Sequence, residues 1–188
     1  MRHSKFFVVL AILSVLPFSP ARSDRMAEPQ ISQAMTVDDA YKAIPHKKTR
    51  FDASAASAEM GAAEKAFLDT FFGLSDLAVA ERVGTQVALS EKRATAAHYD
   101  EILHRLESLS VPPQLAAAHR LVTDAVKEQR QYLDTLKGGG AFDANAPLVE
   151  SSHQKLIQAY NELMRLYPSE NEHNRQAFFD HLCALDFK

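Results

Sequence analysis

Three glutamates are each followed, three residues later, by a histidine, and the pairs are Glu101–His104, Glu150–His153 and Glu170–His173. Residues three apart lie on one face of a helix, one turn from each other. A carboxylate and an imidazole in this arrangement can bind the same transition-metal ion. The chemistry that these residue types could perform is therefore metal binding, provided that helices bring several such pairs together.

The expected turns of the chain place these side chains relative to one another. Counting residues from the turns puts Glu81, His104, His119 and His173 in one layer of a helical bundle. The spacing is similar to that of ferritin-like bundles, in which Glu-x-x-His pairs on facing helices hold two metal ions. This resemblance covers the spacing alone, and it implies a metal-binding or metal-oxidising bundle with these four residues as ligands.

Each Glu-x-x-His pair also has a simpler explanation. His104 falls about 200° around its helix from the apolar Ile102, on the face expected to meet solvent. Glu150 and Glu170 fall near helix starts, where the exposed amides and the helix dipole favour carboxylates. We therefore favour the interpretation that the glutamates of these pairs stabilise helix starts and that the histidines follow them by chance. A metal site is the alternative.

Two histidines, His119 and His153, occupy positions in apolar seams that alternate at spacings of three and four. Buried polar side chains need hydrogen-bond partners. We expect core histidines bonded to Gln129, Tyr160 or a main-chain carbonyl group. The alternative is a haem or small apolar ligand held non-covalently, with one of these histidines as its axial contact. The favoured interpretation includes no cofactor.

The sequence lacks the motifs of other common chemistries. It contains no Cys-x-x-Cys-His for haem attachment and no Gly-x-Ser-x-Gly nucleophile elbow. Cys183 is the only cysteine, so it forms no internal disulfide, and its apolar neighbours predict a buried, unreactive thiol. His181 is two residues away and faces another side of the helix, so it would not activate the thiol. We expect no enzyme activity.

Apolar residues recur at spacings of three and four from residue 58 onward, without the alternation of a strand, and this predicts an all-α body. Prolines and glycines mark the boundaries. The expected helices are 37–43, 58–89, 95–109, 113–137, 146–167 and 169–185, with a turn at 90–93. Short turns predict an up-down antiparallel four-helix bundle, within a domain over 58–188, with a C-terminal fifth helix packed on it and an extended N-terminal strap.

Residues 43–52, AIPHKKTRFD, are called the strap here. Pro45 ends the preceding short helix and favours an extended path. Burial of Ile44 and Phe51 would contribute about 1.5–3 kcal/mol each, whereas an exposed ion pair contributes about 0–1 kcal/mol. We expect Ile44, Pro45 and Phe51 to pack on the bundle. The cations of the strap are expected to face solvent: Lys47, Lys48 and Arg50. The alternative is a docking site for an acidic partner.

The first 23 residues have the features of a secretory signal peptide. The basic start is followed by an apolar run over 6–18 and by small residues at 21–23. The apolar run over 6–18 is shorter than the roughly 20 apolar residues that a membrane-spanning helix needs. We therefore expect cleavage near Asp24, a periplasmic location and no membrane insertion of the mature chain. An N-terminal extension then occupies 24–57.

The charge balance limits the partners of the chain. It carries 24 acidic and 21 basic residues, with a formal net charge of −3, and the expected leader contains bases but no acids. An acidic surface is a poor match for nucleic acid and for anionic membranes. The sequence therefore favours a non-catalytic binding or scaffolding role, with an unknown protein partner or a small ligand.

Overall fold

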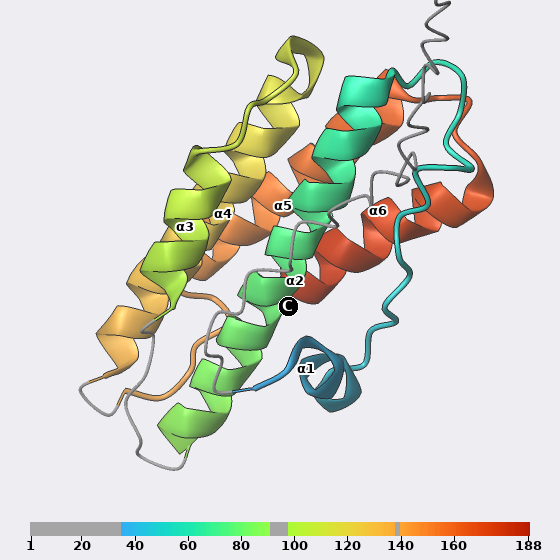
Figure 1. Cartoon of the computed structure of the whole chain (residues 1–188). Helices are drawn as coiled ribbons and strands as arrows, with labels where there is room; N and C mark the ends of the chain where they lie inside the picture. The colour runs from blue at the N-terminus through green and yellow to red at the C-terminus, as the bar shows by residue number, and fades with distance from the viewer. Residues whose placement is uncertain (1–34, 91–97, 138–139) are drawn as a thin grey trace, which may run out of the picture. The chain divides into compact units, whose positions relative to one another are not determined.

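The computed structural model describes residues 35–90, 98–137 and 140–188, and every regular element among them is a helix (Figure 1). The expected leader at 1–23 and most of the expected turn at 90–93 lie outside these residues. The all-α prediction is confirmed. The elements are α1 (Val37–Ala43), α2 (Ala62–Ser90), α3 (Tyr99–Glu107), the 3-10 turn η1 (Pro113–Leu115), α4 (Ala116–Leu136), α5 (Pro147–Leu166) and α6 (Glu172–Leu185).

Side chains at the helix starts explain several of these bounds. Thr36 caps α1, since its hydroxyl oxygen accepts a hydrogen bond from the Asp39 amide at 3.2 Å. Asn171 caps α6 in the same way through the Asn174 amide, at 2.9 Å. Pro147 occupies the first turn of α5, where its missing amide hydrogen costs nothing.

Four helices begin several residues later than predicted. Helix α3 begins at Tyr99 rather than near 95, and α4 begins at Ala116, after η1, rather than near 113. For α2 and α6 a side chain explains the difference. The sequence indicated a start near 58 for α2, but Glu64 bonds back to the Gly61 amide at 2.6 Å and fixes the start at Ala62. The sequence also indicated a start near 169 for α6, whereas the helix begins at Glu172, because Asn171 provides the cap. Gly84 does not interrupt α2, which continues to Ser90.

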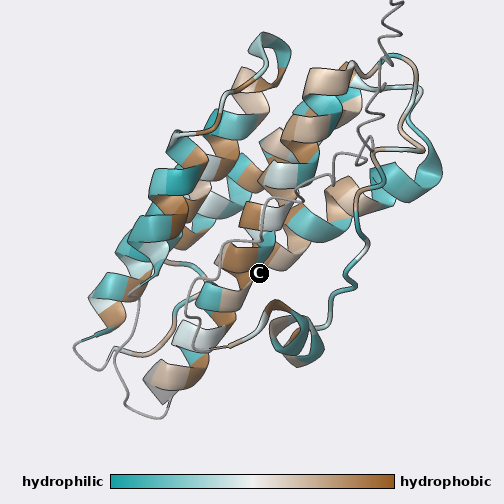
Figure 2. Cartoon of the chain, in the orientation of Figure 1, coloured by the Kyte–Doolittle hydropathy of each residue, from teal (hydrophilic) through white to brown (hydrophobic). Residues whose placement is uncertain are grey.

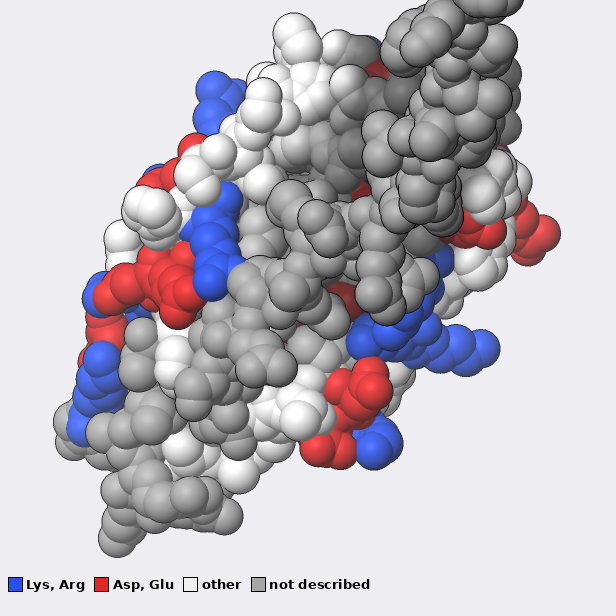
Figure 3. All heavy atoms as spheres, in the orientation of Figure 1, with Lys and Arg blue, Asp and Glu red and all other residues white. Residues whose placement is uncertain are grey.

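Helix α2 is the most enclosed of the described helices. It packs against α1, α3, α4 and α6, and α4 and α5 form the most extensive helix pair. Figure 2 shows brown, apolar helix faces turned toward neighbouring helices and teal, polar faces turned away. On the face drawn in Figure 3, acidic and basic side chains are intermixed rather than gathered into a field of one sign.

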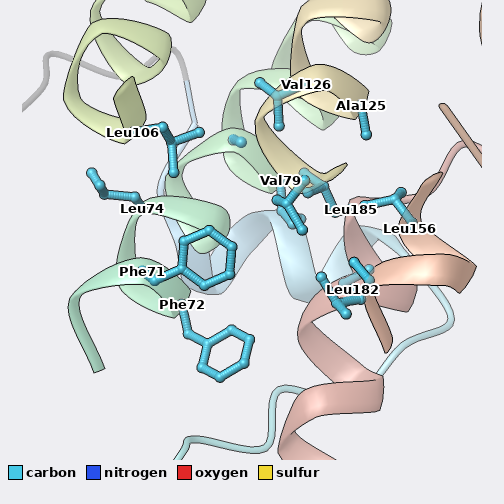
Figure 4. Close-up of a cluster of buried hydrophobic side chains, with 14 of the residues drawn as sticks. Phe71, Phe72, Leu74, Val79, Leu106, Ala125, Val126, Leu156, Leu182 and Leu185 are labelled. Atoms are coloured by element: carbon cyan, nitrogen blue, oxygen red, sulfur yellow. The ribbon is translucent and has the colours of Figure 1, made fainter. Parts of the chain in front are cut away.

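The core is built from side chains of α2, α3, α4, α5 and α6 (Figure 4). Its largest fully buried members include Phe71, Phe72, Leu106 and Leu185. Each such side chain stabilises the fold by about 1.5–3 kcal/mol relative to an exposed position. None of the described helices combines the length and apolarity that crossing a membrane requires.

The carboxyl end of α6 is buried, and polar side chains of two other helices bond its last carbonyl groups. Arg82 Nη2 donates to the Ala184 carbonyl at 2.8 Å, and Gln129 Nε2 donates to the Leu185 carbonyl at 2.7 Å. Such carbonyl groups have no partner inside their own helix. Arg82 is only 4% exposed, and its positive charge lies at the negative end of the helix dipole. We call Arg82 and Gln129 the carbonyl cap of α6.

Replacement of Gln129 by leucine should lower the free energy of unfolding by about 1–3 kcal/mol, because the buried Leu185 carbonyl would lose its donor. Urea unfolding followed by far-ultraviolet circular dichroism measures this change. Gln131→Leu is the control, because Gln131 is exposed on the same helix and its replacement should change stability by about 0.5 kcal/mol or less. Equal stabilities of the two variants would contradict the carbonyl cap.

Candidate functional site

The strap lies against α2 and α6 through one aromatic side chain. Phe51 is 8% exposed, and its ring lies 6.0 Å from that of Phe72 and 5.9 Å from that of Phe178, measured between centroids. Ile44 is partly buried against the same core. The prediction that the strap packs on the bundle is confirmed for these two residues. It is wrong for Pro45, which is exposed.

The main chain of the strap is bonded by side chains of α6. Asn174 accepts a hydrogen bond from the Asp52 amide at 2.8 Å and donates one to the Asp52 carbonyl at 3.0 Å. His173 donates from Nε2 to the Arg50 carbonyl at 2.9 Å. Asn174 is fully buried, and these bonds, together with one from its Nδ2 to Glu170 at 3.2 Å, satisfy its side-chain amide. The Asn174 side chain thus bonds both the amide and the carbonyl group of Asp52, as the main chain of a neighbouring β-strand would.

The loop after the strap, residues 53–61, is bonded in a similar way. The Glu170 carboxylate accepts from the Ser57 amide at 3.1 and 3.2 Å. Asn171 donates to the Ala55 carbonyl at 2.9 Å, and Lys65 donates to the Ala56 carbonyl at 3.0 Å. These contacts are directed at the main chain, so they depend little on the side chains of the loop.

Asp76 of α2 is the centre of a polar cluster beneath the strap. Its Oδ1 accepts hydrogen bonds from Tyr41 Oη and His181 Nδ1, each at 2.8 Å, and Lys48 Nζ lies 4.0 Å from its Oδ2. Burial, and then the charge of Asp76, raises the pKa of Tyr41, so the phenol stays protonated and donates. One carboxylate therefore joins α1, the strap, α2 and α6.

This position of Lys48 differs from the sequence prediction. The strap cations were expected to face solvent, and Lys47 and Arg50 do. Lys48 is half-buried instead, and its Nζ lies 3.0 Å from Asp38 as well as near Asp76. Two acidic side chains and the face of the Tyr41 ring, 5.7 Å from the ammonium, account for this inward orientation.

The two ring nitrogens of His181 have different surroundings. A carboxylate only accepts, so the bond to Asp76 requires a hydrogen on Nδ1. Among the residues that the structure describes, Nε2 has no hydrogen-bond partner. His181 is 3% exposed, and its ring stacks on Phe72 with centroids 4.6 Å apart. A carboxylate that orients an imidazole is also found in general bases and metal ligands. Here the stacked Phe72 ring and the burial favour a structural role that joins α2 to α6.

Cys183 contacts the strap. Its sulfur lies 3.6 Å from His46 Nδ1, and the residue is half-buried rather than fully buried as the sequence indicated. Burial raises the pKa of the Cys183 thiol, and the nearby charges of Asp186 and Asp180 add to this effect. The thiol is therefore less reactive than an exposed one. No hydrogen bond joins it to His181 in the described structure.

Three of the four residues considered as metal ligands bond separate partners, and the fourth is exposed. Glu81 bonds the Nδ1 and the main-chain amide of His98, at 3.2 and 3.3 Å. His104 is exposed on α3. His119 donates to the Leu106 carbonyl at 2.8 Å, and His173 donates to the strap. Across 35–90, 98–137 and 140–188, no three His, Cys, Asp or Glu side chains are grouped so that they could hold a metal ion.

The two seam histidines have the kind of partners that core histidines need. The main-chain carbonyl bonded by His119 is one of the partners predicted for it, and its ring also packs on Phe67 and Phe71. His153 Nδ1 bonds the Asp186 carboxylate, which lies just after α6, rather than Tyr160 or Gln129. Sequence spacing could not have identified Asp186 as this partner, because it follows α6 and lies 33 residues further along the chain.

An open hollow of about 540 Å³ lies between α5 and α6. Two aromatic and three polar residues line it: Tyr160, Glu172, Arg175, Gln176 and Phe179. Phe179 is 47% exposed, although it is a large apolar residue next to the fully buried Phe178. The reason is the turn of the helix: Phe178 points into the core, and the next residue lies about 100° further round.

The hollow was not predicted, since it depends on which face of α6 the strap covers. Ile157 is 41% exposed and lies one turn before Tyr160 on α5, so it extends the apolar part of this surface. Comparisons with protein-family models, curated proteins and solved structures give no match for this chain. The candidate site therefore depends on geometry alone.

Replacement of Phe51 by alanine should lower the free energy of unfolding by about 3–5 kcal/mol, because the cavity between Phe72 and Phe178 would remain unfilled. Urea unfolding measures the change. The matched control is Lys47→Gln combined with Arg50→Gln, which alters exposed strap side chains and should cost about 0.5 kcal/mol or less. If the control lost more stability than Phe51→Ala, charge rather than packing would hold the strap.

Proposed function

We propose that the protein is an exported, non-catalytic helical bundle that binds or scaffolds another molecule in the periplasm. In this proposal the leader over 1–23 is removed near Asp24. Helices α2, α3, α4 and α5 form an up-down antiparallel bundle, on which α6 packs. Contacts between α4 and α5, such as Gln129 with Ser152, and between α5 and α6, such as Tyr160 with Phe179, support antiparallel neighbours.

The exposure of Phe179 beside the α5–α6 hollow is the observation that carries the binding role. Most other phenylalanines of the described chain are buried in the core or in the strap contact. An exposed aromatic ring beside an open hollow with polar side chains offers both apolar contact and hydrogen bonds to a bound molecule. The proposed binding surface comprises the five hollow residues and Ile157.

The partners of the buried polar groups also favour binding over redox or hydrolytic chemistry. Asp76, His181 and Asn174 fasten the strap and α6, and Glu81 bonds His98. These bonds give each group a structural role. A bundle that holds a transition metal or haem is the competing function, and metal analysis and an absorption spectrum of the exported protein distinguish it from the proposed one.

A photo-crosslinking residue tests the proposed surface. The mature chain, with p-benzoylphenylalanine in place of Ile157, is produced in a bacterial periplasm and irradiated. We expect a discrete adduct whose yield falls about tenfold in Phe179→Ser, as expected if binding is weakened by about 1.4 kcal/mol. Phe142→Ser is the control, because Phe142 is also exposed, at 43%, but packs on Tyr132 and Phe187 elsewhere.

Two results would contradict the proposed function. In the first, no adduct forms, or the adduct is equally abundant in Phe179→Ser and Phe142→Ser. The hollow would then take no part in binding. The other is stoichiometric metal or a Soret band in the exported protein, which would assign the chain to the competing class. Circular dichroism of each variant checks that the fold is retained.

A further inference from the structure

We propose that the α5–α6 hollow binds a neutral saccharide. This inference rests on the proposed function, because it names the ligand class of the same surface. A sugar ring offers an apolar face of C–H groups and a rim of hydroxyl groups. The hollow offers an exposed aromatic ring and, beside it, three hydrogen-bonding side chains.

The aromatic part of the hollow has a fixed geometry. Phe179 packs against Tyr160 with ring centroids 5.8 Å apart and an interplanar angle of 79°. This edge-to-face contact restrains Phe179 while leaving nearly half of it exposed. A restrained, exposed ring loses little conformational entropy when a flat apolar surface covers it. The C–H face of a sugar ring is such a surface.

The polar part of the hollow lies on one face of α6. Glu172, Arg175, Gln176 and Phe179 follow one another at intervals of three, one and three residues, which places them along adjacent turns. Gln176 donates to Asp180 at 2.6 Å, so its amide oxygen keeps its capacity to accept. Within the described chain, no hydrogen bond or ion pair occupies the side chains of Glu172 and Arg175.

The charges of the hollow favour a neutral ligand over a charged one. Glu172 supplies a carboxylate that only accepts hydrogen bonds, and Arg175 supplies a guanidinium that only donates. An anion would gain from Arg175 and be repelled by Glu172, and the reverse holds for a cation. Hydroxyl groups both donate and accept, so a neutral sugar can satisfy both side chains at once. The hollow is open to solvent and measures about 540 Å³, so it would cover one face of a sugar rather than enclose it.

Nuclear magnetic resonance of the 15N-labelled mature chain tests this inference, with maltotriose and triacetylchitotriose as probes. We expect at least one of them to shift the amide signals around Tyr160 and from Glu172 to Phe179, with a Kd of about 1 mM. Saturation of aromatic protons should transfer to the ring C–H protons of that sugar.

Variants identify the contacts. Phe179→Ala should weaken sugar binding at least tenfold, and Glu172→Gln and Arg175→Gln should each weaken it several-fold. The two polar positions are exposed, so their replacement leaves the fold intact even if Phe179→Ala does not. Phe142→Ala is the matched aromatic control and should leave the affinity unchanged.

The outcomes separate this inference from the proposed function. If neither sugar shifts the hollow, or if Phe179→Ala and Phe142→Ala bind equally well, the saccharide inference is wrong. A shift caused only by charged peptides also overturns it. In either case a Phe179-dependent photo-adduct would still support the binding role, whereas loss of both the shifts and the adduct would remove the binding role as well.

Discussion

The pairing of the Asn174 side chain with the main chain of Asp52 is the contact on which the other features depend. Helix α6 carries three buried polar residues that need partners from outside the helix, and they are Asn174, Asp180 and His181. Buried amides and carboxylates without partners would cost more than helix packing returns. The strap supplies partners for two of them, since Asp52 pairs with Asn174 and Thr49 bonds Asp180. Asp76 of α2 is the partner of His181. Phe51 adds apolar burial at the same place.

This pairing also determines which face of α6 meets solvent. The strap and Asp76 bind one side of the helix, and Arg82 and Gln129 bond the carbonyl groups at its end. With its rotation and its end position both fixed, α6 turns Phe179 outward beside Tyr160. The hollow is thus a consequence of contacts made on the opposite side of the helix. Bonds from α6 side chains to the main chain of the strap can fix the orientation of the helix, because they do not require particular side chains in the strap.

Local sequence patterns predicted the helices and the burial of Phe51, because periodicity, caps and proline act within a few residues. The main-chain partner of His119 was among those considered, since a buried imidazole must bond something near it. The contact between Asp76 and His181 was not predicted, because it joins residues 105 apart in the chain and neither belongs to a motif. One signal for it existed: Asp76 interrupts the apolar stretch Leu74–Val79. The solvent-facing orientation of Phe179 and the inward orientation of Lys48 could not be predicted, because both depend on how α6 and the strap pack in three dimensions.

Native-state hydrogen exchange at the amides of Asp52 and Ser57 tests the central claim most directly. Both amides donate to α6 side chains, Asp52 to Asn174 and Ser57 to Glu170. If the strap is an integral part of the fold, these amides should exchange with the same free energy of opening as core amides of α6 such as that of Leu182. In Asn174→Ala, protection at Asp52 should fall and that of Leu182 should fall with it. Rapid exchange at Asp52 and Ser57 beside a fully protected Leu182 would contradict the account.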